Sequence, residues 1–453
     1  MASQQHKKNS SGGNLKKLVI IVWILVLILA AALCSILLFG KKQAPIPDSS
    51  SPSDTGQHAA QTNERETEEV KRQEEQKKKE EEAASLVQET DRLALGYFYQ
   101  DAIEKVKSFD QYENYPVLTD ALSRYQSQLD SLVPYEGDVS HVFFHSLIAD
   151  TSKAFDGDSM ENGYNYWMTT VSEFNKMMEQ MYKRGYVLVD IHDVAGPVEQ
   201  DGKTVYRKKE ILLPEGKIPF VLSQDDVSYY NYMKNDGFAK RIVLDENGKP
   251  ACEMIVDGKS VIARDFDVVP LLDVFVEQHP DFSYQGTKGI LALTGYEGAL
   301  GYRVNDEKNE NLEADKEAVR RIAAVLKDGG WSFASHGYGH RHMDQISYDL
   351  LKEDCKKWRD TIGVLIGGTD VYIYPYGEEI DYTTKKYTYM KEKMGFNYFC
   401  GVYAYPWIQI HDDYVRMTRR NLDGFTMYFY PKRTEDLFDV TSVYDPARPP
   451  LKE

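Results

Sequence analysis

Two short polar motifs carry residue types that could bind a metal ion and activate water. The adjacent acids Asp225 and Asp226 and the histidines His336 and His340 each closely follow a run of apolar residues. Neutral imidazoles and a carboxylate are ligands that zinc and similar divalent ions accept. Asp226 and the two histidines would leave positions open for water and substrate. Asp225 would remain unligated and could accept the proton of that water.

Each motif alone also has an ordinary structural explanation. Histidines in a Gly-rich loop are often surface or hydrogen-bonding residues, and an Asp-Asp pair after a strand often caps a helix. The joint position of the motifs at the ends of two predicted strands favours the metal site. His342, a spare imidazole close by, is interpreted as a surface residue.

Apolar strands and amphipathic helices alternate through the part of the chain that holds both motifs. This alternation predicts a parallel sheet or barrel, with its chemistry at the carboxyl ends of the strands. The predicted strands are 141–144, 186–189, 218–222, 290–293, 331–334 and 371–374, and the predicted helices include 174–183 and the apolar stripe of 319–326. Residues 241–264 break the alternation, and their Asn-Gly and Asp-Gly turns predict a β-hairpin insertion.

Residues 18–40 form an apolar stretch without charge, long enough to cross a bilayer. Lysines are more numerous before this stretch than after it, so residues 1–17 are predicted to be a cytoplasmic tail and the rest extracellular. A cleaved signal peptide is the alternative. We therefore expect a single-pass protein of the cell membrane with its catalytic domain outside.

Residues 41–85 are predicted to form a linker and a charged helical stalk, because glutamates and lysines recur four residues apart between 64 and 82. Residues 86–136 carry leucines at helical spacing and predict a small helical neck. Residues 137–450 are predicted to be the catalytic domain. Cys252, Cys355 and Cys400 are interpreted as buried thiols, with one disulfide as the alternative.

The 453 residues carry a formal net charge of −17. This acidic balance argues against a nucleic-acid partner, because no basic face is available to meet phosphates. The sequence does not indicate an oligomeric state.

Three motifs resemble those of the polysaccharide deacetylase family, carbohydrate esterase family 4. The family's Thr/Ser-Phe-Asp-Asp stretch corresponds to Ser-Gln-Asp-Asp at 223–226, and its His-Ser/Thr-x-x-His motif corresponds to His-Gly-Tyr-Gly-His at 336–340. Its third motif, ending in Pro-Tyr/Phe-Gly, corresponds to Pro-Tyr-Gly at 375–377. The resemblance extends over roughly residues 140–424.

The resemblance implies an α/β fold, a distorted (β/α) barrel of the polysaccharide deacetylase type. It implies Asp225 as the general base and Asp226, His336 and His340 as ligands of a divalent metal ion, with zinc expected and cobalt or nickel as alternatives. The backbone N–H of Tyr376 would help to stabilise the tetrahedral oxyanion. The implied partner is an acetylated glycan.

This chain departs from the family at several motif positions. Gln224 and Gly337 replace usual residues, and Tyr372 or Ile373 stands near the place of an Arg that orients the base. Arg419 and Arg420 could replace that Arg. No clear copy of the Leu-x-His motif that supplies the general acid is present; His411 is the nearest candidate and His145 is another.

We therefore expect a metal-dependent deacetylase that removes acetyl groups from an N- or O-acetylated cell-envelope polysaccharide such as peptidoglycan. Aromatic residues in the predicted loops would suit a glycan cleft, because sugars stack on aromatic faces, although core or rim packing explains most of them equally well. The alternative is a catalytically weak or inactive protein that retains the barrel as a glycan-binding or scaffold module.

Overall fold

The computed structural model describes residues 56–451, with side chains described for residue 65 and for residues 67–451. The predicted tail at 1–17 and the predicted transmembrane helix at 18–40 lie outside the described residues. Among residues 56–451, no helix combines the length and the apolar character needed to cross a bilayer. The chain divides into two compact units, residues 1–75 and 76–453, and the second holds the features described below.

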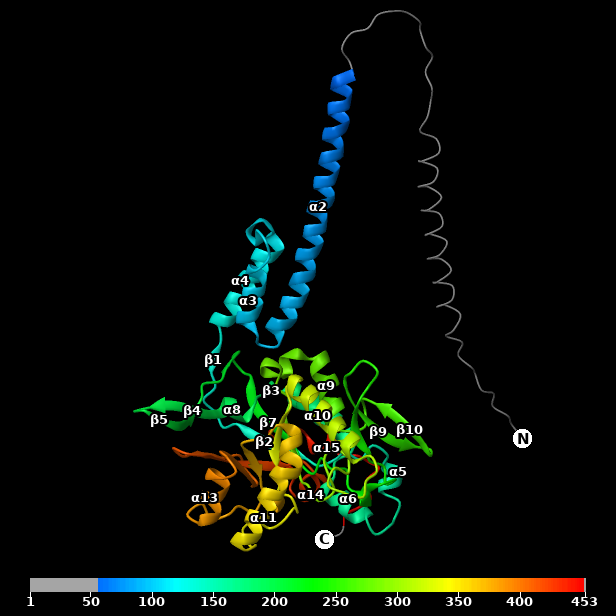
Figure 1. Cartoon of the computed structure of the whole chain (residues 1–453), viewed down its shortest axis with the longest axis vertical. Coiled ribbons are helices and arrows are strands. Elements are labelled where there is room, and N and C mark those ends of the chain that lie inside the picture. Colours follow the sequence, from blue (N-terminus) through cyan, green and yellow to red (C-terminus); the bar gives the residue numbers. More distant parts are fainter. Residues whose placement is uncertain (1–55, 452–453) are drawn as a thin grey trace, which may run out of the picture. The chain divides into compact units, whose positions relative to one another are not determined.

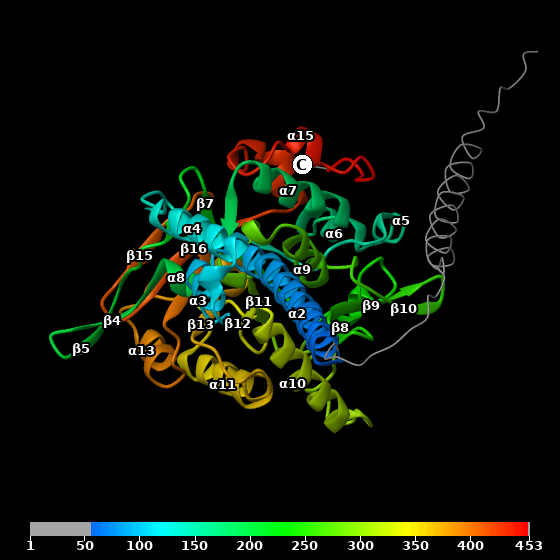
Figure 2. The same cartoon turned by 90° about the horizontal axis from the view of Figure 1, so that it is seen from above.

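Seven parallel strands close into a barrel at the centre of the second unit (Figures 1 and 2). The predicted parallel barrel is therefore confirmed. Around the barrel the strands are β2 (Ser140–Phe144), β7 (Ile218–Gln224), β11 (Ile290–Leu293), β12 (Ser332–Ser335), β13 (Val371–Ile373), β14 (Tyr398–Val402) and β16 (Val415–Asn421), which pairs with β2 again.

Strand β7 has three neighbours in the sheet, and the barrel is distorted there. One edge of β7 pairs with β2 from Phe220 to Gln224. The other edge pairs first with β3 (Tyr186–Leu188) and then, through Ser223 and Gln224 only, with β11. The ring therefore closes over just two residues of β7, directly before the acid pair.

Amphipathic helices cover the outside of the barrel, as Figure 2 shows. The helix α10 buries Val319, Ile322, Ala323 and Leu326, the stripe predicted from the sequence, while its other face stays in solvent. The longer helices of the barrel are α7 (Val171–Lys183), α9 (Val268–Gln278), α10 (Leu312–Asp328) and α11 (Tyr348–Trp358). The shorter ones are α5 (Thr151–Ala154), α6 (Glu161–Trp167), α8 (Ile191–Val194), α12 (Val364–Ile366), α13 (Lys385–Glu392), α14 (Gly424–Phe429) and α15 (Val440–Val443).

The insertion at 241–264 is a three-stranded antiparallel sheet, so the predicted single hairpin was too small. Its strands are β8 (Arg241–Leu244), β9 (Pro250–Val256) and β10 (Lys259–Ala263), in the order β10-β9-β8. Both glycine turns close a hairpin of their own, and the two hairpins share β9.

Further strands lie outside the barrel ring and were not predicted. Strands β4 (Ala195–Gln200) and β5 (Lys203–Lys208) form a hairpin whose turn, Asp201-Gly202, has positive φ at both residues. An Asp-Gly pair between two short runs is the signal that could have revealed it. The remaining strands are β1 (Val133–Pro134), paired with β6 (Leu212–Leu213), and β15 (Ile408–Ile410), antiparallel to β16.

The neck consists of the last part of α2 (Gly56–Leu95) packed on α3 (Tyr99–Lys107) and α4 (Pro116–Asp130). The predicted boundary between stalk and neck, at residue 85, falls inside one continuous helix. Residues 67–82 are exposed throughout, and Ala83 is the first buried side chain among those described in α2. The helix therefore continues unbroken while its surroundings change from solvent to apolar neighbours.

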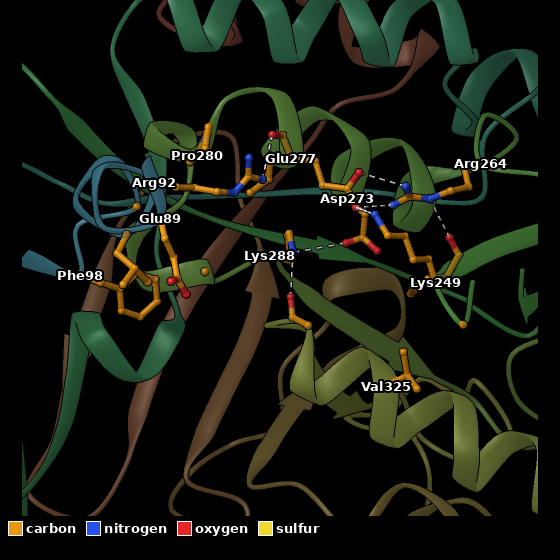
Figure 3. A pocket seen from close by; sticks show the side chains of 17 residues that line it. Glu89, Arg92, Phe98, Lys249, Arg264, Asp273, Glu277, Pro280, Lys288 and Val325 are labelled. Carbon is orange, nitrogen blue, oxygen red and sulfur yellow. Dashed lines mark hydrogen bonds and ion pairs between the residues drawn. The ribbon is translucent and has the colours of Figure 1, made fainter. Parts of the chain in front are cut away.

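The neck attaches to the amino-terminal end of the barrel. Arg92 donates to the backbone oxygen of Glu277 at 3.1 Å, and the Tyr97 hydroxyl donates to that of Asp281 at 2.8 Å. A cavity of about 540 Å³ lies along this seam (Figure 3). Its charged side chains pair with one another: Glu277 accepts from Arg264 and Lys249, and Lys288 lies 3.4 Å from Asp273.

The pairing of Glu277 predicts a pH dependence of stability. Hydrogen bonds from Arg264 lower the pKa of Glu277 from 4.5 to about 2. A lowered carboxyl pKa gives stability that is present above pH 4.5 and is lost as the pH falls through 2. We expect Glu277→Gln to cost about 1 kcal/mol or less at neutral pH, since the side chain is 40% exposed, and the difference from wild type to shrink towards pH 2.

Urea unfolding at a series of pH values measures this difference directly. The exposed Glu136, 3.9 Å from Lys208, supplies the control: Glu136→Gln should show little difference from wild type at any pH. If the difference in unfolding free energy between Glu277→Gln and wild type stayed constant down to pH 2, the prediction would be contradicted.

Candidate metal centre and catalytic base

The acid pair lies in the turn that follows β7, at the carboxyl end of the barrel. The backbone N–H of Asp225 donates to the oxygen of Phe144 in β2 at 2.8 Å, which fixes the start of the turn. Asp226 then has a φ of 58°, in the left-handed region that aspartate tolerates better than most residues. The two neighbouring carboxylates both approach His336 Nε2, at 3.9 Å from Asp225 and 4.0 Å from Asp226, but their other partners differ.

The two histidines lie in a tight loop after β12, and Asp354 of α11 holds that loop in shape. The Asp354 carboxylate accepts from the backbone N–H groups of Tyr338 at 2.6 Å and Gly339 at 2.9 Å. Gly337 has a φ of 66°, and a Cβ there would meet the Asp354 carboxylate at 3.1 Å and the Tyr372 hydroxyl at 3.2 Å. A glycine therefore suits this position, which explains one departure from the family motif.

The imidazole of His336 is held in one tautomer. Its Nδ1 lies 2.8 Å from the backbone oxygen of Ile373; because a carbonyl can only accept, Nδ1 carries the proton. The deprotonated Nε2 is then free to bind a cation. Burial lowers the pKa of His336 to about 4, which favours the neutral ring that a metal requires.

Asp226, His336 and His340 converge on one point. The Nε2 of His336 lies 4.0 Å from one carboxylate oxygen of Asp226, and the Nε2 of His340 lies 3.8 Å from the other. One ligand atom from each residue lies within 4.8 Å of the others. A divalent ion about 2.0–2.2 Å from each atom would fit such a set. Burial raises the pKa of Asp226, but the two histidines outweigh it and the net shift is downward.

Tyr230 fixes the orientation of the Asp226 carboxylate. Its hydroxyl donates to Asp226 Oδ1 at 2.6 Å and lies 2.9 Å from the Thr294 hydroxyl at the end of β11. Stacking on Tyr232 and Tyr296 fixes the Tyr230 ring in turn, with centroids 5.6 and 5.1 Å away. Partners of this kind orient a metal ligand and leave its other oxygen for the ion.

Asp225 is paired with Arg419 of β16. Both carboxylate oxygens lie close to Arg419 Nη1, at 2.6 and 2.8 Å, and both side chains are buried. Burial alone would raise the pKa of Asp225, but the Arg419 charge lowers it to about 2, so the group is ionised at neutral pH. Of the two arginines suggested as substitutes for the missing motif Arg, Arg419 is therefore the one beside Asp225, the predicted base. Arg420 binds Asp436 instead.

Tyr376 lies at the edge of the same cluster. It is in the short 3₁₀ turn Pro375–Gly377 after β13, with a φ of 59°. Its ring centroid is 4.6 Å from that of His340 and 4.0 Å from that of His342, which stacks on it. The residue proposed to supply an oxyanion N–H is therefore next to the candidate metal ligands.

Of the two histidines considered as the general acid, His145 is near Asp225 and Asp226, and His411 is not. His411 is exposed, stacks on Tyr414 and lies beyond β15, at the amino-terminal end of β16. Arg419 lies towards the other end of β16, so the structure does not bring His411 to the cluster. His145 directly follows β2, and its charge contributes to the lowered pKa of both Asp225 and Asp226.

Several aromatic side chains that the sequence placed in loops are exposed around the carboxyl end of the barrel. Tyr296 is 39% exposed, and Tyr403 and Tyr405, which follow β14, are more than half exposed. Others that could have lined a cleft are core residues, namely Tyr229, Tyr230 and Tyr302. The three cysteines at 252, 355 and 400 are free and buried, as predicted.

Sequence reasoning named Arg419 only as one of two untested substitutes and did not find Tyr230 or Asp354 as supporting residues. The sequence signal for Arg419 was the pair of arginines in the run Val415–Asn421. Apolar and polar residues alternate too weakly in this run to predict a buried strand. Asp354 lies in a polar helix face, where a carboxylate usually contacts solvent.

A scan against protein-family models and a search of curated proteins find no match to this chain. Solved structures do resemble it. A candidate polysaccharide deacetylase from Bacillus anthracis matches 67% of this chain and 69% of its own, with 12% identity and a TM-score of 0.38. The Streptococcus pyogenes deacetylase PplD, solved with acetate, matches 69% of this chain and 100% of its own, with 10% identity and a TM-score of 0.35.

A candidate polysaccharide deacetylase from Mycobacterium smegmatis matches 33% of this chain and 44% of its own, with 16% identity and a TM-score of 0.21. Because these TM-scores lie below 0.5, the likeness assigns no residue and no activity to this chain.

The buried pair predicts a large and asymmetric effect on stability. Arg419→Met should lower the free energy of unfolding by about 3–5 kcal/mol, because it leaves the Asp225 carboxylate buried without a cation. Adding Asp225→Asn should recover part of that loss, since the unpaired charge is then gone. Urea unfolding of chelator-treated protein measures each step of this double-mutant cycle.

An exposed ion pair gives the matched control. Arg207 lies 2.7 Å from Asp412, whose side chain is 75% exposed, so Arg207→Met should cost less than about 1 kcal/mol. If Arg419→Met cost no more than this control, the pair would not be the stabilising element described here.

Proposed function

We propose that this protein is a metal-dependent deacetylase that removes acetyl groups from an N- or O-acetylated polysaccharide of the cell envelope, such as peptidoglycan. One observation carries the proposal: Asp226, His336 and His340 converge, while the neighbouring Asp225, 3.9 Å from His336 Nε2, is paired with Arg419. A site with three protein ligands and an adjacent unligated base is suited to hydrolysis.

Asp226, His336 and His340 would hold the ion, with zinc proposed first. When bound, such an ion lowers the pKa of a coordinated water and polarises the acetyl carbonyl. Asp225 would accept a proton from the attacking water, and Arg419 would keep the carboxylate ionised and fix its orientation. The backbone N–H of Tyr376 donates to the carbonyl oxygen as it becomes negative. Acetate and a free amine or hydroxyl are the products.

We propose His145, in place of His411, as the group that protonates the leaving amine or alkoxide. Its Nδ1 lies 3.1 Å from the backbone oxygen of Trp167 and therefore donates to it. Nε2 is then the nitrogen from which a protonated ring would release its proton. His145 and Asp225 follow adjacent strands, which places an acid and a base beside one another.

Exposed aromatic side chains support a glycan as the substrate, because the apolar faces of sugar rings stack on aromatic rings. Trp167, whose backbone holds His145, is 48% exposed, and Tyr376, beside His340, is 56% exposed. Exposed aromatic side chains are thus available close to both His145 and His340. A position outside the cell, with residues 18–40 as the membrane anchor, is part of the same proposal and rests on the lysine distribution around those residues.

The non-catalytic alternative depended mainly on an absent arginine and an unidentified acid. Arg419 occupies the place beside the base that the absent arginine would have filled, and His145 offers an acid near the same pair. Both observations favour an enzyme over a glycan-binding scaffold.

Release of acetate from oligomers of N-acetylglucosamine tests the proposal. We expect zinc-loaded wild type to release acetate, and Asp225→Asn, which keeps the shape of the base but not its charge, to lower the rate by about 10²–10⁴-fold. An O-acetylated glycan in a parallel assay separates amide from ester cleavage.

The exposed Asp349, 88% accessible on the surface helix α11, provides an Asp-to-Asn control that should leave the rate unchanged. Failure of wild type to release acetate from either substrate, while it binds both, would instead support the scaffold alternative.

A further inference from the structure

A second buried aspartate, Asp267, lies at the start of α9 and has no role in the mechanism above. It is fully buried and forms four hydrogen bonds. Its Oδ1 accepts from the backbone N–H groups of Val268 at 2.8 Å and Leu147 at 2.9 Å. Its Oδ2 accepts from the Gln224 side chain at 2.9 Å and the Tyr229 hydroxyl at 2.6 Å.

The two bonds to Oδ2 lie on either side of the acid pair. Gln224 is the residue directly before Asp225, and Tyr229 is three residues after Asp226. One carboxylate oxygen therefore joins the two ends of the turn that carries both the base and a candidate metal ligand. The bond to Leu147 adds the loop after β2, which carries His145.

The turn needs such a support because its backbone is strained. Asp226 has a φ of 58° and Tyr229 a φ of 50°; for a bulky tyrosine this left-handed conformation is unfavourable. Such conformations cost about 1–3 kcal/mol each and persist only where surrounding contacts impose them. Asp267 supplies the hydrogen bond that holds the Tyr229 side chain.

The insertion at 241–264 leads directly to Asp267, at the start of α9. The chain leaves β10 and reaches the carboxylate four residues later, at the start of α9. Cys252 of β9 lies 3.8 Å from the Tyr229 hydroxyl, so the inserted sheet also packs against the other partner of Asp267. The insertion thus contributes to the architecture of the site although none of its residues belongs to the cluster.

We propose that Asp267 is a positioning residue, which sets the geometry of the Asp225-Asp226 turn through Gln224 and Tyr229. This inference rests on the proposed function, because it assumes that the turn holds a metal ligand. It also gives Gln224 a purpose: its amide is a donor to Asp267, which an apolar residue at that motif position could not be.

A plain helix cap is the competing explanation. Asp267 does cap α9, but only through Oδ1 and the N–H of Val268. Oδ2 makes no bond to α9. Capping of α9 therefore requires only Oδ1. The experiment has to isolate the effect of the two hydrogen bonds that Oδ2 accepts.

Zinc affinity of the purified protein, measured by competition with a chelator, is the readout. Asp267→Asn leaves one acceptor oxygen for four donors, and we expect the dissociation constant for zinc to rise about 10–100-fold, the size found for residues that orient metal ligands. Tyr229→Phe, which leaves Asp267 in place, should raise it by a smaller factor.

Asp273 provides a matched control on the same helix. It is buried, and its carboxylate accepts from the Trp331 side chain at 2.9 Å and pairs with Lys288 at the far end of the barrel (Figure 3). Asp273→Asn should lower the melting temperature yet leave zinc affinity within about twofold, since no ligand-orienting contact is lost.

The outcomes separate the inference from the proposed function. Wild type that binds no zinc overturns both. Wild type that binds zinc, with Asp267→Asn and Tyr229→Phe equal to it, overturns the positioning role alone. Should Asp267→Asn fail to fold, Tyr229→Phe and Gln224→Met decide: weakened zinc binding in either supports the role, and unchanged binding in both refutes it.

Discussion

Two adjacent ionised carboxylates repel one another, so a site that holds both needs separate partners for them. In this protein Arg419 pairs with Asp225, whereas Asp226 lies near His336 and His340, the two imidazoles that would share a divalent ion with it. The left-handed backbone at Asp226 makes this separation feasible, because it sends successive side chains in different directions. The proposed division of roles into base and metal ligand rests on that separation.

The Arg419–Asp225 pair depends in turn on the order of three neighbouring strands. Arg419 belongs to β16, which pairs with β2, and β2 pairs with β7 directly before the acid pair. This order brings together an arginine and an aspartate that are 194 residues apart in sequence. The same buried ion pair therefore belongs both to the wall of the barrel and to the candidate site.

Much of the barrel was predictable because its strands are short apolar runs: β2, β7, β11, β12 and β13 all fall within a residue or two of the predicted ranges. Strands β14 and β16 were not predicted. The run Val415–Asn421 contains three arginines, and only its tertiary partners show that two of them are buried. A sequence pattern reports solvent exposure well and long-range charge pairing poorly.

The candidate site divides in the same way. Its acid pair and histidine pair were visible as motifs, since their spacing is local. The supporting residues Arg419, Tyr230, Asp354 and Asp267 act across loops or strands that only the folded chain brings together. The two candidates for the general acid show what the sequence cannot reveal. His411 fits the order of the family's motifs, yet His145, at the end of a neighbouring strand, is the histidine near Asp225 and Asp226.

The most direct measurement is anomalous scattering at the zinc absorption edge from a crystal of the zinc-loaded protein. The account predicts one strong peak about 2.0–2.2 Å from the Nε2 atoms of His336 and His340 and from an oxygen of Asp226, with Asp225 outside bonding distance. A peak at His342, Asp344 and Glu378, the other candidate ligand group among the described residues, or no peak at all, would contradict it.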